Sequence, residues 1–373
     1  MIVKRAIQDT IEQFLFKNKI IIIYGARQVG KTTLVKSIMQ KYQDIALYLN
    51  CDEPDIRLSL YNRTSTELNY IIGQKKLVII DEAQMVKDIG LTLKLLIDNY
   101  PDIQVIATGS SSFDLASTIS QPLTGRKIEF RLFPFSIGEL HTIYSRLEID
   151  RLLPQFLIYG MYPEIVLSKE NTPLLLKNLA FSYSYKDVLQ YQQIKNPEIL
   201  EKLLQALALQ IGNEVSYNEL SSLVGIDKNT VANYIRILEQ AFIIFKLPPL
   251  SRNLRNEIKK LRKIYFWDTG IRNALINNFN LLELRQDTGA LWENFFISER
   301  LKFLHNSMKN KNTYFWRTQQ KHEIDYVEED NNQFDAFEIK WNKQKIKFPA
   351  IFSENYTVAH HYPVSRQNYQ DYL

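Results

Sequence analysis

Two glycines, a lysine and a threonine stand at fixed spacing near the start of the chain and could together hold a chain of phosphates. Gly25, Gly30, Lys31 and Thr32 fill the pattern GxxxxGK[ST]. Glycine lets the backbone come close to a ligand, so that successive N–H groups can point at phosphate oxygens. The lysine places a full positive charge on the outer phosphates, and the threonine hydroxyl suits a magnesium ion. The spacing therefore predicts a loop that binds ATP and Mg²⁺.

This loop must lie between a strand and a helix if it is to bind phosphate. The apolar run at 20–24 predicts the strand, and apolar side chains at 34, 35, 38 and 39 give the following helix one face that can pack on a sheet. The first turn of such a helix adds unpaired N–H donors and a partial positive charge. The residues that we expect to contact the nucleotide are Gly25, Ala26, Arg27, Gln28, Val29, Gly30, Lys31, Thr32, Thr33, Asp81 and Ser110.

Two adjacent acids follow a second buried strand. Residues 77–80 are all apolar, and Asp81 and Glu82 come directly after them. Adjacent acids in this position are typical of a Walker B motif, and ligands bind at strand ends in sheets buried by helices. We expect Asp81 to hold magnesium together with Thr32, and Glu82 to orient the attacking water. The alternative is a solvated turn after a strand.

Two further loops offer polar groups to the same site. A strand predicted from 103 ends at Thr108 and Ser110, either of which could sense the γ-phosphate, although such hydroxyl groups also cap helices and form turns. Arg126 lies beside a glycine turn, from which a guanidinium could reach the triphosphate of a neighbouring subunit. The alternative for this arginine is a surface ion pair. The catalytic residues that we predict are Glu82, Lys31 and Arg126.

The middle of the chain shows the pattern of a helix-turn-helix. Helices are predicted at 216–225 and 227–241 with a glycine turn between them. Strands at 242–247 and 263–267 would form a wing, and residues 251–263 carry six basic side chains against one acidic. A positive wing beside such a helix favours nucleic-acid binding, whereas a solvated charged face or a packing module are the alternatives. The predicted DNA contacts are Lys228, Asn229, Asn233, Arg236, Arg255, Lys259 and Lys260.

The C-terminal part carries carboxylates at a spacing that suits metal-assisted phosphodiester hydrolysis. Asp325 lies in a predicted strand, and the next strand carries Glu338 and Lys340 on one face. Two carboxylates beside a lysine can hold one or two magnesium ions and activate a bound water. Glu293 in a preceding helix would complete this nuclease-like group, and the alternative is a hairpin with alternating polar positions. The predicted metal ligands of the whole chain are Thr32, Asp81, Asp325 and Glu338.

Length and composition bound the class of protein. The chain has 373 residues, of which 45% are hydrophobic and 23% charged, which is ordinary for a globular protein of two or three domains. Its single cysteine, Cys51, excludes an internal disulfide and a cysteine-based metal cluster. The first residues are charged where a signal peptide is apolar, and the run at 20–24 is too short to span a bilayer. We expect a cytoplasmic protein with ATP and nucleic acid as partners and no membrane, which could form a homo-oligomer.

These motifs together resemble those of bacterial and archaeal AAA-type ATPases that join a P-loop domain to a winged helix and a PD-(D/E)XK nuclease-like domain. The resemblance covers nearly the whole chain and rests on residues 25–32, 77–84, 108–111, 123–126, 133–136, 323–325 and 338–340.

The resemblance implies an α/β fold in three parts. Residues 1–196 would form a P-loop parallel sheet of the additional-strand class with a helical lid, 197–286 a winged helix-turn-helix, and 287–373 an α/β restriction-endonuclease-like domain. It also implies ATP hydrolysis with Mg²⁺, coupled to DNA binding or processing. The alternative is a nucleotide-dependent DNA- or protein-binding switch whose nuclease-like domain is inactive.

Overall fold

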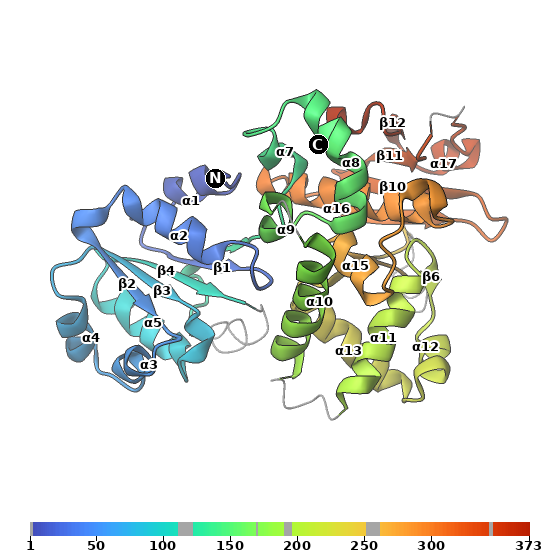
Figure 1. The fold of residues 1–373 in the computed structure, drawn as a ribbon. Helices are drawn as coiled ribbons and strands as arrows, with labels where there is room; N and C mark the ends of the chain where they lie inside the picture. The colour runs from blue at the N-terminus through green and yellow to red at the C-terminus, as the bar shows by residue number, and fades with distance from the viewer. Residues whose placement is uncertain (1–2, 111–121, 169–170, 190–195, 251–261, 343–345) are drawn as a thin grey trace. The chain divides into compact units, whose positions relative to one another are not determined.

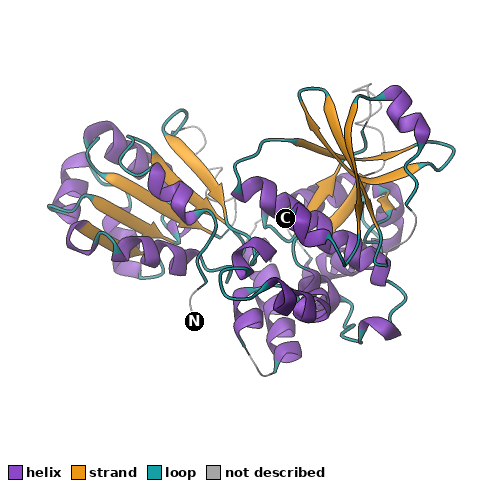
Figure 2. Cartoon of the chain, turned by 90° about the horizontal axis from the view of Figure 1, so that it is seen from above, coloured by secondary structure: helices purple, strands orange, loops and turns teal. Residues whose placement is uncertain are grey.

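The computed structural model describes residues 3–110, 122–168, 171–189, 196–250, 262–342 and 346–373. It divides the chain into two compact units. Figure 1 labels the helices and strands along the chain, and Figure 2 colours the chain by secondary structure. The first unit comprises Ile2–Phe133 with Gln240–Phe242, and the second comprises Pro134–Glu239 with Ile243–Leu373. Residues 134–196 therefore belong to the same compact unit as the C-terminal half of the chain.

The first unit is built on a five-stranded sheet in which all strands are parallel. The order β2-β3-β4-β1-β5 puts β4 between β1 and β3, as the additional-strand class requires. Every residue of β1, β3 and β4 is buried, which explains the continuous apolar runs in the sequence. The strands are β1 (Ile20–Tyr24), β2 (Ala46–Asn50), β3 (Leu77–Asp81), β4 (Gln104–Gly109) and β5 (Lys127–Arg131). The predicted parallel sheet is confirmed.

Helices cover both faces of this sheet. Helix α2 connects β1 to β2 and α5 connects β3 to β4, and these two crossovers run in opposite directions along the sheet. Right-handed connections therefore put α2 and α5 on opposite faces (Figure 1). The helical elements are α1 (Gln8–Gln13), α2 (Lys31–Gln40), η1 (Gln43–Ile45), α3 (Pro54–Leu60), α4 (Ser65–Ile72), η2 (Ala83–Met85) and α5 (Ile89–Asn99).

The second unit opens with helices and continues into a small sheet. The strands of this sheet are antiparallel and have the order β6-β8-β7. Helix α13 is amphipathic, since Val231, Ile235 and Leu238 are buried while Lys228 and Arg236 are exposed. The elements are α7 (Ile137–Leu140), α8 (Arg146–Tyr159), α9 (Pro163–Leu167), α10 (Thr172–Leu189), α11 (Pro197–Leu209), β6 (Glu214–Val215), α12 (Tyr217–Val224), α13 (Lys228–Gln240), β7 (Ile244–Leu247) and β8 (Arg262–Phe266).

A short buried helix, α15 (Thr269–Leu275), holds the second unit together. All of its residues are buried, and its polar side chains bond to the end of α8, to α11 and to Asp287 before the long C-terminal helix. Asp268 at its N-cap accepts a hydrogen bond from the backbone N–H of Met161 at 2.6 Å. Asn273 donates to the carbonyl oxygen of Leu157 at 3.0 Å. Because buried polar groups need partners, these bonds fix how the segments pack.

The C-terminal part of the second unit packs a long helix against a four-stranded sheet of order β12-β11-β10-β9. Strand β12 is parallel to β11, and the other pairs are antiparallel. The elements are η3 (Leu282–Leu284), α16 (Thr288–Asn306), β9 (Asn312–Arg317), β10 (Glu323–Asp330), β11 (Gln333–Ile339), α17 (Ala350–Asn355), β12 (Val358–Val364) and η4 (Tyr369–Tyr372). Across the described ranges, no helix combines the length and the apolar character needed to span a bilayer.

Candidate functional site

The predicted phosphate loop connects β1 to α2, and both of its fixed glycines have a structural reason. Gly30 has a φ of +95°, which side chains other than glycine rarely adopt. A Cβ at Gly25 would lie 2.3 Å from the carbonyl oxygen of Leu132, so the chain leaving β5 needs a glycine there. The Nζ of buried Lys31 donates to the carbonyl oxygens of Gly25 at 3.0 Å and Ala26 at 2.9 Å. The loop therefore curls around its own lysine.

The helix after the loop is suited to an anion. Helix α2 begins at Lys31 with Gly30 as its N-cap, so no side chain of the N-cap satisfies the N–H groups of the first turn. Buried Arg5 supports the loop from the other side, because its guanidinium donates to the carbonyl oxygens of Val29 at 2.5 Å and Phe133 at 2.6 Å. Nothing in the sequence pattern indicated this role, since both partners are far from Arg5 along the chain.

Asp81, at the end of β3, is the centre of a hydrogen-bond network. Its side chain is buried, and Oδ2 accepts hydrogen bonds from the hydroxyl groups of Thr32 at 2.7 Å and Tyr48 at 2.6 Å. Oδ1 accepts a hydrogen bond from the hydroxyl of Thr108. Thr108 in turn accepts one from the backbone N–H of Glu82 at 3.1 Å. The structure thus brings the predicted phosphate loop, the two acids and the predicted sensor strand to one place.

Tyr48 is a member of this network that the sequence did not reveal. It lies on β2, two residues before Asn50, which pairs with Asp81 in the parallel ladder. Residues two apart on a strand point to the same face of the sheet, so Tyr48 lies on the same face as Asn50. Burial, followed by the hydrogen bond to Asp81, raises the pKa of Tyr48. The phenol therefore stays neutral and donates to the carboxylate over the whole physiological range. Only the register between β2 and β3 could have identified it.

A magnesium ion and a triphosphate fit the residues present. Thr32 donates its hydroxyl proton to Asp81, so the lone pairs of its oxygen remain available to a cation. The three hydroxyl partners are neutral, so they satisfy the Asp81 carboxylate without cancelling its charge. Magnesium prefers oxygen ligands and keeps several waters, which suits one hydroxyl and one carboxylate. The exposed or half-buried loop residues Arg27, Gln28 and Thr33 leave the loop open to a ligand.

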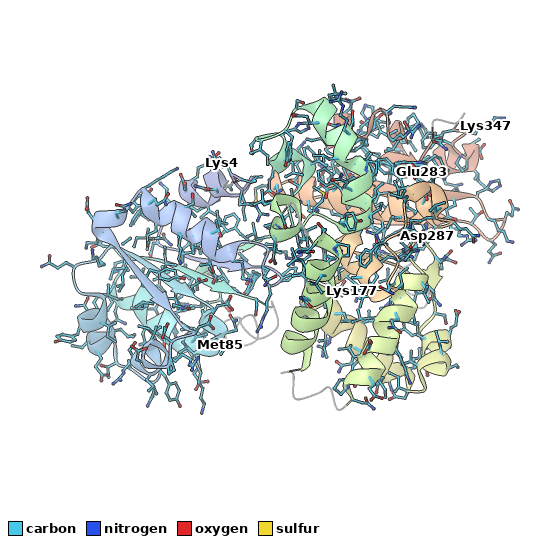
Figure 3. The ribbon with its side chains drawn as sticks, viewed as in Figure 1. Lys4, Met85, Lys177, Glu283, Asp287 and Lys347 are labelled. Carbon is cyan, nitrogen blue, oxygen red and sulfur yellow. The ribbon has the colours of Figure 1, made fainter. Side chains whose placement is uncertain are left out.

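Glu82 is held by a neighbour two residues along the chain. Its backbone is left-handed, with a φ of +53°, and leads into the turn η2. Glu82 Oε2 accepts a hydrogen bond from Gln84 Nε2 at 2.5 Å. The same amide nitrogen donates to the hydroxyl of Ser110 at 3.1 Å. Figure 3 labels Met85, the last residue of this turn. The predicted sensor Ser110 is therefore connected to the predicted water-orienting acid.

Arg126 forms a surface ion pair in the first unit. Its Nε lies 2.6 Å from Asp98 Oδ1, and both side chains are more than a third exposed. This is the contact that the sequence offered as the alternative to a catalytic role. The role of Arg126 in a neighbouring subunit stays a prediction.

Of the predicted DNA contacts, those on α13 belong to the residues that the structure describes, and those in the wing do not. Lys228, Asn229 and Arg236 are exposed on α13, and half-buried Asn233 accepts a hydrogen bond from Arg236 at 2.8 Å. The wing residues Arg255, Lys259 and Lys260 lie outside the residues that the structure describes.

One member of the basic stretch needs a correction. Lys263 is not a surface charge, because it is 1% exposed and its Nζ lies 2.6 Å from Glu323 and 3.0 Å from Glu293. A lysine enclosed by two carboxylates cannot add to a positive surface. The sequence counted it with the wing because the last two residues of that stretch, Arg262 and Lys263, are also the first two residues of strand β8.

The C-terminal acids Asp325 and Glu338 lie together beside the ammonium group of Lys340. The antiparallel register of β10 and β11 pairs Tyr326 with Phe337, so Asp325 and Glu338 are opposite one another. The Nζ of Lys340 lies 3.1 Å from Asp325 and 3.3 Å from Glu338. Among the residues that the structure describes, no set of three or more His, Cys, Asp or Glu side chains is placed to hold a metal.

Glu293 on α16 faces the same group. It accepts a hydrogen bond from the Tyr265 hydroxyl at 2.5 Å in addition to its pairing with Lys263. Burial and then the charge of Asp325 raise the pKa of Glu293 to about 7. The same two causes, in the same order, raise the pKa of Glu338 to about 8. This site therefore holds its carboxylates in a low-dielectric environment where added negative charge is unfavourable.

Three family models match successive segments of the chain. Residues 17–141 match a family described as AAA domain. Residues 150–282 and 288–370 match two families, each described as a domain of unknown function, DUF8612 and DUF4143. The phosphate loop and the Asp81 network described above lie within the first of these segments.

Curated relatives span most of the chain. An uncharacterized protein of Methanocaldococcus jannaschii is 27% identical over 333 residues, covering 80% of this chain and 74% of the relative. An uncharacterized protein of Mycobacterium tuberculosis is 25% identical over 345 residues, which cover 91% of this chain and 74% of that relative.

Two solved structures show weaker likeness. The Aeropyrum pernix ORC1 protein in complex with DNA has a TM-score of 0.35 at 11% identity, covering 73% of this chain and 92% of that chain. The Pif1 helicase of Candida albicans has a TM-score of 0.24 at 14% identity, and the match covers 41% of this chain and 44% of that chain. In family match and in sheet order, the first part of the chain is similar to AAA-type P-loop ATPase domains.

Proposed function

We propose that this protein binds ATP with the loop at residues 25–33 and hydrolyses it with magnesium. The observation that carries the proposal is the network around Asp81, which joins Thr32 of the phosphate loop to Thr108 of β4. Two motifs that are 49 residues apart in sequence thus meet in one hydrogen bond. The AAA-domain match over residues 17–141 supports the same class of protein.

Each side chain of the site would have one task. Lys31 and the first turn of α2 would bind the phosphates through charge and N–H donors. Thr32 and Asp81 would hold the magnesium ion, which would offset the negative charge of the phosphate oxygens. Glu82 would accept a hydrogen bond from the attacking water and orient it, since phosphoryl transfer depends on positioning more than on covalent catalysis by the protein.

Two substitutions test this proposal separately at the binding and the hydrolysis steps. Glu82→Gln should keep ATP binding in calorimetry while phosphate release stops, because the amide cannot act as the acceptor that polarises water. Lys31→Ala should lose ATP binding. Glu53→Gln and Lys76→Ala change exposed residues of the same unit and are the matched controls. Normal turnover in Glu82→Gln, or unchanged affinity in Lys31→Ala, would contradict the proposal.

The proposal includes a nucleic-acid contact made by residues 197–286. The element order α11, β6, α12, α13, β7, β8 fits a winged helix-turn-helix, and the exposed Lys228 and Arg236 on α13 support it. We expect the double variant Lys228→Ala and Arg236→Ala to weaken duplex DNA binding and to lower the salt slope by about one per lost phosphate contact. An unchanged slope, equal to that of Lys76→Ala, would indicate a packing module instead.

A second candidate is a nucleotide-dependent switch whose C-terminal domain does not cleave DNA. The pairing of Lys340 with Asp325 and of Lys263 with Glu293 favours it, because both carboxylates already face a cation of the chain itself. In Mg²⁺ or Mn²⁺, wild type should cleave DNA no faster than Asp325→Ala or Lys340→Ala. Cleavage that disappears in both variants would favour a magnesium nuclease.

A further inference from the structure

We propose that Gln84 is a positioning residue that connects Ser110 to Glu82 and orients the Glu82 carboxylate toward the attacking water. The inference rests on the ATP hydrolysis proposed above. Gln84 acts through Glu82, which it holds by a hydrogen bond, and takes no direct part in the reaction. Neither a family description nor the spacing of the motif assigns it this task.

The contacts of one amide nitrogen carry the first step of the argument. Gln84 Nε2 lies 2.5 Å from Glu82 Oε2 and 3.1 Å from Ser110 Oγ. A hydrogen bond to a carboxylate is stronger than one between neutral groups, so it can set the rotamer of the acid. In the described part of the chain, the other oxygen of Glu82 has no hydrogen-bond partner, which leaves it to a water.

The other end of the Gln84 amide shows that this arrangement is costly for the fold. Its carbonyl oxygen Oε1 is buried and lacks a hydrogen-bond partner among the described residues. A buried oxygen without a partner is unfavourable, and such atoms in a native structure call for a functional explanation. Turning the amide over would place this oxygen against the Glu82 carboxylate. The charge of Glu82 therefore sets the orientation of the amide.

The backbone conformation of Glu82 supports the same inference. Glu82 has a left-handed backbone with a φ of +53°, an uncommon conformation for a residue with a side chain, and it turns the chain into η2. Ser110 follows the end of the neighbouring strand β4. The amide thus spans two adjacent strand ends, so a shift of Ser110 on contact with a phosphate would also shift Glu82.

The variant Gln84→Met tests this inference, because methionine keeps the length of the side chain and removes the amide. We expect the turnover number to fall about tenfold, the size expected for a hydrogen bond to a charged group. The KM for ATP should change by less than about twofold if binding is unaffected. The melting temperature should stay equal or rise, because the unpaired buried oxygen is gone. Gln74→Met at an exposed position is the control.

A second variant gives a readout that a structural role would not change. Gln84→Glu keeps the shape of the side chain but places a like charge beside the Glu82 carboxylate in place of a donor. The turnover number should therefore fall further than in Gln84→Met, while the KM for ATP stays within about twofold of wild type. A turnover number equal to that of wild type would contradict the inference.

The outcomes separate this inference from the proposed ATPase activity. If wild type turns over ATP, Glu82→Gln does not, and Gln84→Met equals wild type, the inference is wrong and the ATPase proposal stands. If Gln84→Met loses turnover and melting temperature together, Gln84 is structural and the inference is again wrong. If wild type itself fails to release phosphate, the ATPase proposal fails, and the inference fails with it.

Discussion

Two groups of largely buried carboxylates lie in this chain, one in each unit, and they have different partners. Asp81 in the first unit accepts hydrogen bonds from three neutral hydroxyl groups. In the second unit, Asp325 is paired with the ammonium group of Lys340, and Glu293 with that of Lys263. Both groups are largely buried, so the difference lies in the partners and not in the exposure.

This difference determines what each group can bind. Hydroxyl donors satisfy the hydrogen-bonding capacity of a carboxylate and leave its negative charge to attract a cation. An ammonium group within about 3 Å already supplies the positive charge, and burial makes that pair costly to separate. We therefore expect the two groups to differ in function, the Asp81 group being suited to a metal ion and the other to ion pairs that hold segments together. The following predictions test this comparison.

The largest effect is expected from Lys263→Met. Removing this ammonium leaves the largely buried Glu293 without its cation, which should cost about 3 to 5 kcal/mol of unfolding free energy, whereas Glu323 keeps its ion pair with Arg317. Lys4→Met is the matched control, because Lys4 and its partner Asp9 are 55% and 59% exposed and the change should cost less than about 1 kcal/mol. Urea unfolding measures both. Equal losses would mean that burial does not distinguish the two lysines.

The next effect concerns turnover. Asp81→Asn should lower phosphate release at saturating Mg²⁺ and ATP at least about a hundredfold, or about 2.7 kcal/mol, because the amide brings no charge to the metal. Asp325→Asn should leave ATP turnover unchanged. If the two variants lose turnover equally, the comparison between the two groups fails.

A third prediction concerns a carboxylate that is neutralised by two arginines. Asp287, labelled in Figure 3, lies 2.5 Å from Arg272 and 2.8 Å from Arg285. Burial alone would raise the pKa of Asp287, but the hydrogen bonds from the two arginines lower this pKa to about 2. The stabilisation is therefore present above about pH 4 and is lost as the pH falls toward 2. The ionised carboxylate of Asp287 contributes about 2 kcal/mol to the free energy of unfolding.

The variant Asp287→Asn should lack this acid-dependent loss. We expect the difference in unfolding free energy between wild type and variant to be constant above about pH 5 and to shrink between about pH 4 and 2. Denaturant titrations at a series of pH values measure it. A difference that does not change with pH would show that folding leaves the pKa of Asp287 unchanged.

The smallest effect is expected from Tyr48→Phe. The substitution removes one of the hydroxyl groups on Asp81 and leaves the ring in place. Losing this hydrogen bond, worth about 1 kcal/mol, should raise the Mg²⁺ concentration for half-maximal turnover about fivefold. Tyr70→Phe is the control, because Tyr70 is 90% exposed. A lower magnesium requirement would mean that the tyrosine competes with the metal.

Local sequence pattern predicted the elements that carry the strongest periodicity. The continuous apolar runs of β1, β3 and β4 indicated a sheet buried on both faces, and the structure has that sheet with β4 in the middle. Short elements such as α15 and β12 were missed, because a few residues do not show a clear period. Their packing comes from partners far away along the chain.

The sequence by itself determined the phosphate loop and the positions of the acids, since GxxxxGK[ST] and an acid pair after a strand are local patterns. Only the tertiary structure decided which partners those acids have. Tyr48 reaches Asp81 through the register of two parallel strands, and Lys263 is buried because α16 brings Glu293 to it. Hydrogen bonds and ion pairs depend on distance in space, and sequence spacing predicts that distance only within one helix, strand or turn.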